Sequence, residues 1–259
     1  MNSIIRKIIQ YLARNRHVFK FAQRVAFDHR GENNCNITTN GELIFLRNNI
    51  SKFETVFDVG ANVSEWTNSL LEMKDNIKVH SFEPVKDTFS KLKEKVKSDS
   101  VVFANIALGD ENKKTFFNIY GTCSVLNSFH QRKNVGLEVV DTQEVDMVKL
   151  DDYCKKNNIT SINLVKIDVE GCEFETLKGA YNMLSDGVDV VQFEYGGAYI
   201  DSRSLLKDVF KYLTDLSFDI YKILPHKLVK VEYQQSLENF QNANFIAVNK
   251  RVAQKYDIN

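Results

Sequence analysis

The chain has 259 residues, with 34 basic and 34 acidic side chains, and 43% of its residues are hydrophobic. This composition is typical of a globular protein and excludes a disordered chain, a collagen-like chain and a disulfide scaffold. No apolar run reaches the roughly 18 residues of a membrane-spanning helix. The N-terminal stretch also lacks the uninterrupted apolar core and cleavage site of a signal peptide. We therefore expect a cytoplasmic protein.

The charge is unevenly distributed. Residues 1–30 contain seven basic residues and one acidic residue, whereas the remainder is net negative. A net negative body argues against a nucleic-acid partner. Apolar residues follow helical spacing at the N-terminus, at Ile4, Ile5, Ile8, Ile9 and Leu12. Such a basic amphipathic helix either caps the body with its charges in solvent or contacts an acidic partner or an anionic membrane surface. We describe residues 1–39 as a basic helical extension and leave open peripheral contact with the inner membrane surface or a glycolipid.

From residue 53 onward, strand-like runs alternate with helical stripes, which predicts a parallel sheet covered by helices. The predicted strands are residues 54–59, 77–82, 101–107, 162–169 and 188–194. Two later runs, 218–224 and 244–248, have no convincing helix between them and predict an antiparallel hairpin at the sheet edge. Residues 113–150 resemble an inserted hairpin or ribbon. With no further boundary visible, residues 40–259 are predicted to form one domain.

The first strand-like run ends in Asp58 and a turn through Gly60, at the place where open α/β sheets bind nucleotides. Asn62 and Glu65 have capping-box spacing at the start of the next helix. The glycines of a dinucleotide fingerprint are missing. Asp58 would repel a pyrophosphate, so the turn favours a cationic or polar ligand.

A second acid, Glu83, ends the next run, twenty-five residues after Asp58. A carboxylate at this position can accept hydrogen bonds from both hydroxyls of a ribose. Alternatively, Glu83 is a helix N-terminal acid favoured by the macrodipole. Together with Asp58 it predicts an adenosine site.

A third group of acids follows the central strands. Asp168 and Glu170 are two residues apart, so they point the same way while the backbone is extended, and Glu194 ends the next strand. Three carboxylates in one cleft require cationic groups, shared protons or a metal ion. Mg²⁺ prefers such oxygen ligands, but we assign no metal. Glu173 and Glu175, in the first helical turn, are expected to be solvated.

These motifs resemble the FkbM-type methyltransferases, which use S-adenosylmethionine. The resemblance is an ordered series from Asn40 to Val248. It consists of residues 40–42 (NGE), 57–62 (FDVGAN), 81–84 (SFEP), 105–110 (NIALGD), 124–126 (SVL), 148–153 (VKLDDY) and 166–180 (KIDVEGCEFETLKGA). One departure is Ser64, where the family usually has glycine; we expect cofactor binding to survive it.

The resemblance implies a class I methyltransferase, a Rossmann-like α/β fold with a mostly parallel seven-stranded sheet and an antiparallel edge hairpin. It places the methionine part of the cofactor at the turn after Asp58, the ribose at Glu83 and the adenine beside Asn105. The full set of implied cofactor-binding residues is Glu42, Asp58, Gly60, Ala61, Asn62, Glu83, Pro84, Asn105, Ile106, Ala107 and Asp168.

The implied reaction moves a methyl group from a sulfonium to a nucleophile, and an alcohol must also lose its proton. Holding the methyl donor and the acceptor close together and in line supplies part of the rate enhancement. The candidate catalytic residues are Asp168, Glu170, Glu194 and, from the inserted segment, His130, whose ordinary pKa suits a general base. Because the family is associated with glycan and natural-product tailoring, we expect O-methylation of a sugar or another small hydroxyl-rich acceptor.

Two other functions compete with this one. A methyltransferase fold can bind the cofactor as a scaffold without catalysis, but a scaffold has no need of several acids in one cleft. A nicotinamide-dependent oxidoreductase is disfavoured by the missing glycines. The sequence names neither the acceptor nor the oligomeric state.

Overall fold

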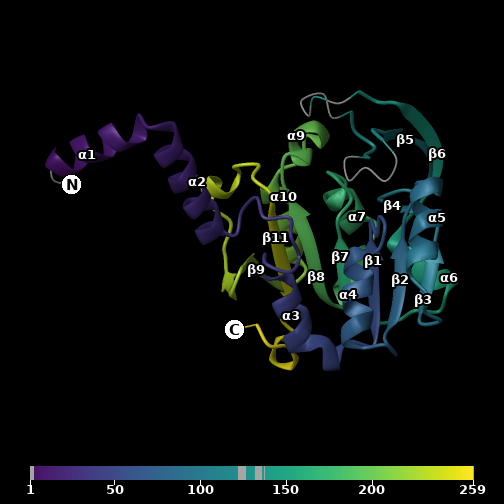
Figure 1. Ribbon diagram of the computed structural model, residues 1–259. Coiled ribbons are helices and arrows are strands. Elements are labelled where there is room, and N and C mark those ends of the chain that lie inside the picture. The colour runs from purple at the N-terminus through teal and green to yellow at the C-terminus, as the bar shows by residue number, and fades with distance from the viewer. Residues whose placement is uncertain (1–2, 122–126, 132–135, 137, 259) are drawn as a thin grey trace.

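The computed structural model describes residues 3–121, 127–131, 136 and 138–258 (Figure 1). The segment Ser124–Leu126, which contributes to the family resemblance, lies outside the described residues.

The core is an eight-stranded sheet with the order β10-β9-β11-β8-β7-β1-β2-β3. Five neighbouring strands are parallel: β3 (Val101–Ala104), β2 (Lys78–Phe82), β1 (Thr55–Val59), β7 (Ile162–Ile167) and β8 (Val188–Tyr195). The antiparallel edge consists of β11 (Ala243–Asn249), β9 (Phe218–Leu224) and β10 (Lys227–Lys230). This topology confirms the class I methyltransferase fold. The prediction omitted β10, a short, largely exposed edge strand.

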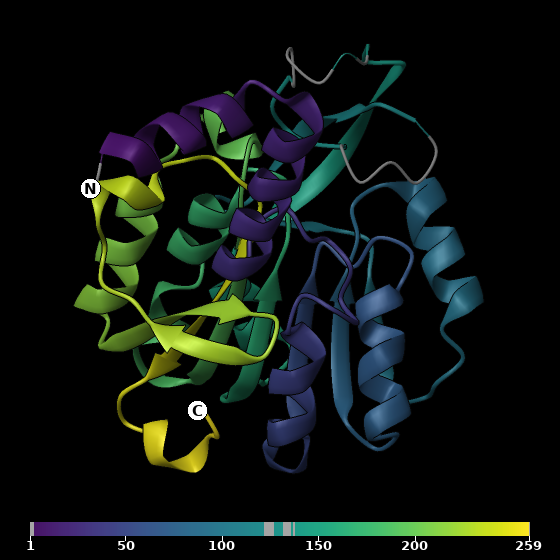
Figure 2. The ribbon, with the colours of Figure 1, turned by 60° about the vertical axis from the view of Figure 1, so that its left-hand side comes forward.

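Helices cover both faces of the sheet. Successive side chains of a strand point to opposite faces, so neighbouring residues join different clusters. Val56 and Phe57 are adjacent in β1 and fully buried, yet they belong to two different hydrophobic clusters. The Val56 cluster includes α3 (Glu42–Asn49), α4 (Glu65–Met73) and α5 (Lys86–Lys95). Figure 2 looks onto these three helices, coloured from dark to light blue. The Phe57 cluster includes α6 (Leu150–Lys156), α7 (Glu173–Lys178), α8 (Tyr181–Asp186), α9 (Ala198–Ser202) and α10 (Leu206–Asp215).

The inserted segment forms a second sheet. Its strands β5 (Lys113–Ile119) and β6 (Asp141–Val148) pair antiparallel, as the predicted hairpin requires, and β4 (Ala107–Leu108) pairs with β6. The predicted strand 101–107 was therefore too long, since β3 ends at Ala104. The described residues also include the short 3₁₀ helices η1 (Ile50–Lys52), η2 (Gln235–Leu237) and η3 (Ala253–Lys255).

Phe174, Leu177, Tyr181 and Leu184 have the spacing of one continuous apolar helix face, but the structure forms two helices, α7 and α8. Between α7 and α8, Gly179 lies against the backbone of Gly109, and a Cβ on Gly179 would come within 1.9 Å of the Gly109 carbonyl oxygen. The close approach of these two backbone segments leaves no room for a side chain at Gly179, where the helix is interrupted.

The N-terminal helices α1 (Ser3–Ala13) and α2 (Arg16–Arg30) lie outside the sheet layers (Figure 1). The Asn15 side chain caps α2 by accepting hydrogen bonds from the backbone N–H groups of His17 and Val18. Gly31 ends α2 with a φ of 62°. None of the helices in the described part of the chain combines the length and hydrophobicity needed to cross a bilayer. The division into residues 1–39 and 40–259 stays a prediction.

Candidate functional site

A cavity of about 720 Å³ lies where the carboxyl ends of β1, β2, β7 and β8 meet, the usual ligand position in open α/β sheets. The predicted site residues that line it are Glu42, Gly60, Ala61, Asn62, Glu83, Pro84, Ile106, Ala107, Asp168, Glu170 and Glu194. Three other predicted residues, Asp58, Asn105 and His130, are not among the described residues that line the cavity. The structure thus brings most of the set together, and the individual roles stay predictions.

The turn after β1 is held between the ends of two other strands. The N–H groups of Gly60 and Ala61 both donate to the carbonyl oxygen of Phe82, each at 3.0 Å. Gly60 has a φ of 81°, and a Cβ there would lie 1.9 Å from the carbonyl oxygen of Asp168. Only glycine fits, because both the conformation and the close approach exclude a side chain.

The capping box predicted from Asn62 and Glu65 is wrong. Helix α4 begins only at Glu65, after Ser64. Asn62 and Ser64 have φ angles of 45° and 86°, so this stretch still belongs to the turn. Ser64 thus occupies the left-handed region that favours glycine, at the position where the resembling family usually has glycine. The N–H of Asn62 is used elsewhere and donates to Glu83 Oε2 at 3.1 Å.

Glu83 is a buried carboxylate at the end of β2. Its two oxygens accept one backbone hydrogen bond each, Oε2 from Asn62 and Oε1 from Val85 at 2.9 Å. Burial raises the pKa of Glu83 to about 7, although the two backbone N–H groups act in the opposite direction. Asn105 supports this loop from outside the cavity, since its amide donates to the carbonyl oxygens of Glu83 and Pro84. One lone pair on each Glu83 oxygen remains for a ligand.

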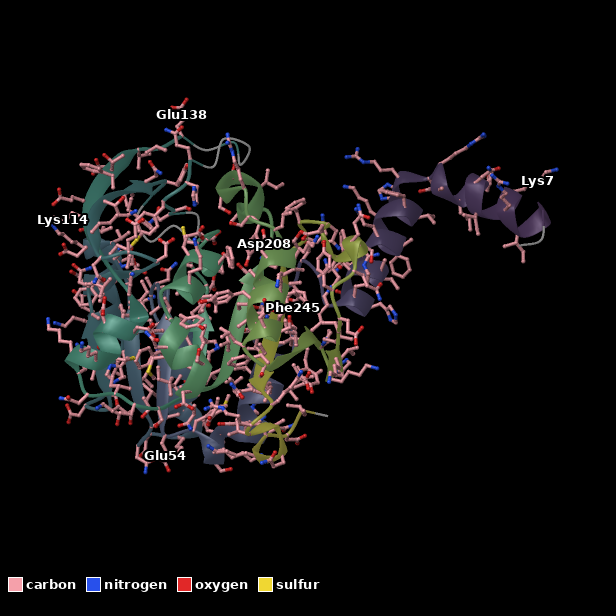
Figure 3. The ribbon with its side chains drawn as sticks, turned by 180° about the vertical axis from the view of Figure 1, so that it is seen from behind. Lys7, Glu54, Lys114, Glu138, Asp208 and Phe245 are labelled. Carbon is pink, nitrogen blue, oxygen red and sulfur yellow. The ribbon has the colours of Figure 1, made fainter. Side chains whose placement is uncertain are left out.

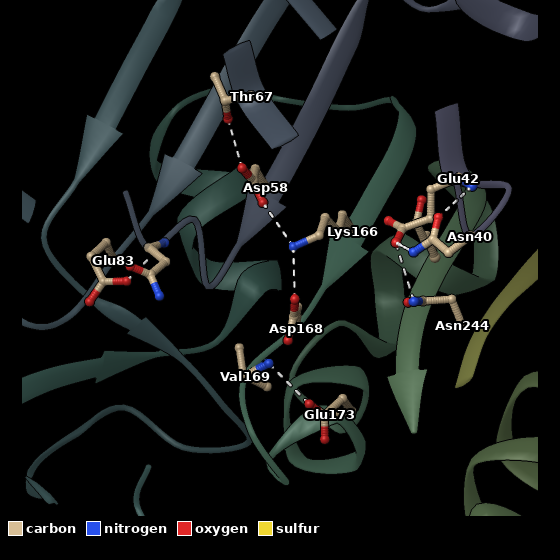
Figure 4. Close-up of polar contacts among 12 residues, drawn as sticks. Asn40, Glu42, Asp58, Thr67, Glu83, Lys166, Asp168, Val169, Glu173 and Asn244 are labelled. Atoms are coloured by element: carbon tan, nitrogen blue, oxygen red, sulfur yellow. Dashed lines mark hydrogen bonds and ion pairs between the residues drawn. The ribbon is translucent and has the colours of Figure 1, made fainter. Parts of the chain in front are cut away.

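Lys166 lines the cavity and is the centre of an ion-pair network (Figure 4). The Lys166 Nζ atom is 3.2 Å from Asp168 Oδ2 and 3.6 Å from Asp58 Oδ1. Burial alone would lower the pKa of Lys166, but the neighbouring carboxylates raise it above its ordinary value. Asp58 is fully buried and also accepts a hydrogen bond from Thr67 Oγ1 at 2.7 Å.

The sequence prediction assigned no role to Lys166. A signal was present, because Lys166 and Asp168 are two residues apart at the end of one strand. No such pattern reveals the partner Asp58 on β1, which becomes a neighbour only through parallel pairing of the two strands.

Glu42 joins the start of α3 to two strands of the sheet. Its carboxylate accepts hydrogen bonds from the side-chain amides of Asn40, Gln192 on β8 and Asn244 on β11 (Figure 4). Burial raises the pKa of Glu42 above its ordinary value. Asn244 on β11 pairs in register with Glu194. The residues hydrogen-bonded to Glu42 are therefore next to Glu194 at the end of β8.

The loop after β7 is shaped by Glu173. Its carboxylate is buried and accepts hydrogen bonds from the N–H groups of Val169 and Gly171, each at 3.0 Å. The expectation that Glu173 is solvated is thus wrong, because the side chain turns back onto the loop. Burial raises the pKa of Glu173 to about 7. Glu170 has a φ of 54°, so the loop, rather than an extended strand, brings Glu170 near Asp168.

Three carboxylates converge in this loop region. Oxygen atoms of Asp168, Glu170 and Glu194 all lie within 4.8 Å of one another. Burial raises the pKa of Glu194 well above its ordinary value, and the charges of Asp168 and Glu170 add to this effect. Such a group can share a proton, accept hydrogen bonds from hydroxyls or hold a divalent cation through oxygen ligands.

The inserted segment reaches the same loop through Ser128. Ser128 is buried and its Oγ donates to the backbone carbonyl oxygen of Glu170 at 2.8 Å. The backbone N–H of His130 donates to that same Oγ at 3.2 Å. The insertion therefore contacts the acidic loop through a serine that the sequence prediction did not name.

Aromatic residues from distant parts of the chain complete the lining, at Trp66, Phe117, Phe129, Tyr199 and Phe240. Phe117 and Phe129, both from the insertion, pack edge to face with ring centroids 4.6 Å apart. From sequence alone, such residues cannot be distinguished from ordinary core residues.

Comparison with known proteins assigns the family. A model of the methyltransferase FkbM domain matches residues 58–220, more than half of the chain. Hexuronic acid methyltransferase AglP of Haloferax volcanii is 27% identical over 172 residues, and the match covers 66% of each protein. The chain thus spans just under two thirds of that relative.

Two solved structures are also similar. A methyltransferase FkbM from Methylobacillus flagellatus KT has 15% identity and a TM-score of 0.48, with 75% of this chain and 43% of that chain covered. Precorrin-6y C5,15-methyltransferase from Geobacter metallireducens GS-15 has 11% identity and a TM-score of 0.44, with 78% and 85% covered. On the strength of the match over residues 58–220, the chain belongs to the FkbM family of methyltransferases.

Proposed function

We propose that this methyltransferase transfers the methyl group of S-adenosylmethionine to a hydroxyl of a sugar or another small, hydroxyl-rich acceptor. The observation that carries the proposal is that one cavity is lined both by Glu83, a buried carboxylate after β2, and by the three convergent carboxylates after β7 and β8.

The residues at the Glu83 end of the cavity fit the cofactor. Glu83 has a free lone pair on each oxygen, which suits the two ribose hydroxyls. Asn62 Oδ1 is buried and has no hydrogen-bond partner among the described residues. An unpaired buried oxygen costs about 1–3 kcal/mol, so a ligand donor such as an ammonium or hydroxyl group stabilises it. The apolar side chain of Ile106, which also lines the cavity, suits the adenine ring.

The carboxylates fit the acceptor half of the reaction. When bound, S-adenosylmethionine supplies an electrophilic methyl group on a sulfonium, and the acceptor oxygen must lose its proton as it attacks. Asp168 and Glu194 can orient that hydroxyl by accepting its hydrogen bond, and one of them can take the proton. A carboxylate with a raised pKa, such as Glu194, is a stronger base than an exposed one.

The charge of this region favours a neutral acceptor. Lys166 is the one basic residue among the described residues that line the cavity, and it is already paired with Asp168 and Asp58. Next to three carboxylates, an acidic group on the acceptor would be repelled. The relative named above is a hexuronic acid methyltransferase; for this chain we propose a neutral sugar hydroxyl.

A methyl-transfer assay tests the proposal. Radiolabelled S-adenosylmethionine is incubated with neutral glycans, uronic-acid glycans, phenols and amines, and mass spectrometry locates the methyl group in any product. Asp168→Asn and a matched control at the cavity mouth, Glu65→Gln, are run in parallel; Glu65 is exposed and lines the same cavity. The proposal predicts an O-methylated neutral sugar whose formation Asp168→Asn suppresses and Glu65→Gln does not. Transfer only to nitrogen, or to no acceptor in a panel that includes whole-cell glycan extracts, would contradict it.

A further inference from the structure

The N-terminal helices expose several large apolar side chains. In α1, Ile5, Ile9 and Leu12 are 49%, 50% and 43% exposed, and their spacing places them on one side of the helix. Figures 1 and 3 show α1 projecting clear of the sheet layers in views from opposite sides. In α2, Phe21 and Val25 are 72% and 50% exposed. Large apolar side chains gathered in this way mark an interaction surface.

The polar sides of both helices are basic. Lys7 lies opposite the apolar stripe of α1 and Arg6 lies beside it, and Lys7 is labelled near the tip of the helix in Figure 3. Arg16, Lys20 and Arg24 follow one another at four-residue intervals along α2 and are all exposed, so they share one side of that helix. Of the seven basic residues in this segment, Arg30 alone forms an ion pair within the part of the chain that the structure describes; its partner is Glu32.

We propose that α1 and α2 bind the chain to the surface of an anionic lipid bilayer. The apolar stripe would enter the interface while the basic side contacts lipid phosphates. Amphipathic helices with large apolar side chains and a basic polar face bind such surfaces in the plane of the membrane, and each basic residue near an anionic surface adds to the attraction. With 11 residues, α1 extends only about 16 Å, about half the thickness of a bilayer core, so it lies on the membrane rather than across it.

Attachment through α1 and α2 would also fix the position of the cavity relative to the bilayer. Asn33, Cys35 and Ile37 follow α2 directly and line the cavity, and the N–H of Asn33 donates to the carbonyl oxygen of Asn242 at 2.8 Å. A membrane-bound α2 therefore holds the cavity close to the bilayer surface, within reach of an acceptor carried there. This inference concerns attachment and does not depend on the acceptor being a sugar.

Vesicle co-sedimentation of the full chain tests it. The probes are vesicles of phosphatidylcholine alone and of phosphatidylcholine with phosphatidylglycerol. We expect binding only to the anionic vesicles, and binding at least tenfold weaker for Arg6→Glu/Lys7→Glu/Lys20→Glu. The matched control reverses three exposed charges on the body, Lys93→Glu/Lys95→Glu/Lys97→Glu, and should bind like the unmodified chain. Circular dichroism and thermal melting verify that every variant is folded.

A second variant, Ile9→Ser/Phe21→Ser/Val25→Ser, tests the apolar contribution without changing charge and should also bind at least tenfold more weakly. Light scattering tests the alternative that the apolar surface of α1 and α2 binds a second copy of the chain. Absence of binding to anionic vesicles, equal losses in the charge variant and its control, or a stable dimer abolished by the serine variant would each overturn the proposal.

Discussion

Glu83 should make cofactor binding depend on pH near neutrality. Its pKa of about 7 means that the carboxyl group is half protonated at that pH when the cavity is empty. Each oxygen already accepts one backbone hydrogen bond. Both ribose hydroxyls can therefore donate to Glu83 only when no proton occupies a remaining lone pair. Cofactor binding should select the ionised form.

The size of the effect follows from the ionised fraction. With a pKa of about 7, about 9% of Glu83 is ionised at pH 6 and about 91% at pH 8, so the apparent affinity should be about tenfold lower at pH 6. Glu83→Gln keeps the shape of the side chain but cannot ionise. It should lose about 1–3 kcal/mol of binding free energy at pH 8, and its affinity should vary less between pH 6 and pH 8.

Isothermal titration calorimetry with S-adenosylhomocysteine at pH 6, 7 and 8 measures both effects. Glu65→Gln is the matched control, since it removes an exposed carboxylate from the cavity lining and should retain the pH dependence. Glu173 and Glu194 also have raised pKa values. Any pH dependence of the affinity that they cause is common to the unmodified chain, Glu83→Gln and Glu65→Gln. The same change of affinity with pH in Glu83→Gln and in the unmodified chain would refute the assignment of Glu83 to the ribose.

Four further perturbations test other parts of the site. Asp168→Asn or Glu194→Gln should lower kcat by about 10²–10⁴-fold under saturating cofactor; unchanged kcat in both would remove the carboxylates from the chemistry. Gly60→Ala should abolish binding in calorimetry and lower the melting temperature, because its Cβ would lie 1.9 Å from the Asp168 carbonyl oxygen; normal binding would contradict the described turn. Lys166→Met should lower the free energy of unfolding by about 3–5 kcal/mol in urea titrations, because it leaves the charge of buried Asp58 unpaired; a loss below about 1 kcal/mol would mean that Asp58 is neutral. Turnover should survive a chelator, because the proposed role of the acids is proton transfer; activity lost in the chelator and restored by Mg²⁺ would assign them to a metal.

Much of the fold could be predicted because the central strands are buried on both faces. Consecutive residues such as Val56 and Phe57 must then both be apolar, which produces recognisable runs. Edge strand β10 has no such constraint, since its four residues are exposed or half-buried. The break between α7 and α8 depends on Gly109, seventy residues from Gly179, and no local pattern indicates that contact.

The position of the site could be predicted for a similar reason. Parallel strands end at the same edge of a sheet, so Gly60, Glu83, Asp168 and Glu194 had to lie near one another. Details that depend on loop conformation could not be predicted. The return of Glu173 onto its own loop requires unusual backbone angles, such as the φ of 54° at Glu170.

We propose that the cavity binds S-adenosylmethionine, and a direct comparison of cofactors tests this assignment. Calorimetry of the unmodified chain is performed with S-adenosylhomocysteine, NAD and NADP under identical conditions. We expect one S-adenosylhomocysteine to bind per chain and this binding to be lost in Gly60→Ala. We expect neither nicotinamide nucleotide to bind, because the turn after β1 lacks the glycines of a pyrophosphate cradle. Preferential binding of NAD or NADP, or S-adenosylhomocysteine binding that Gly60→Ala leaves unchanged, would contradict it.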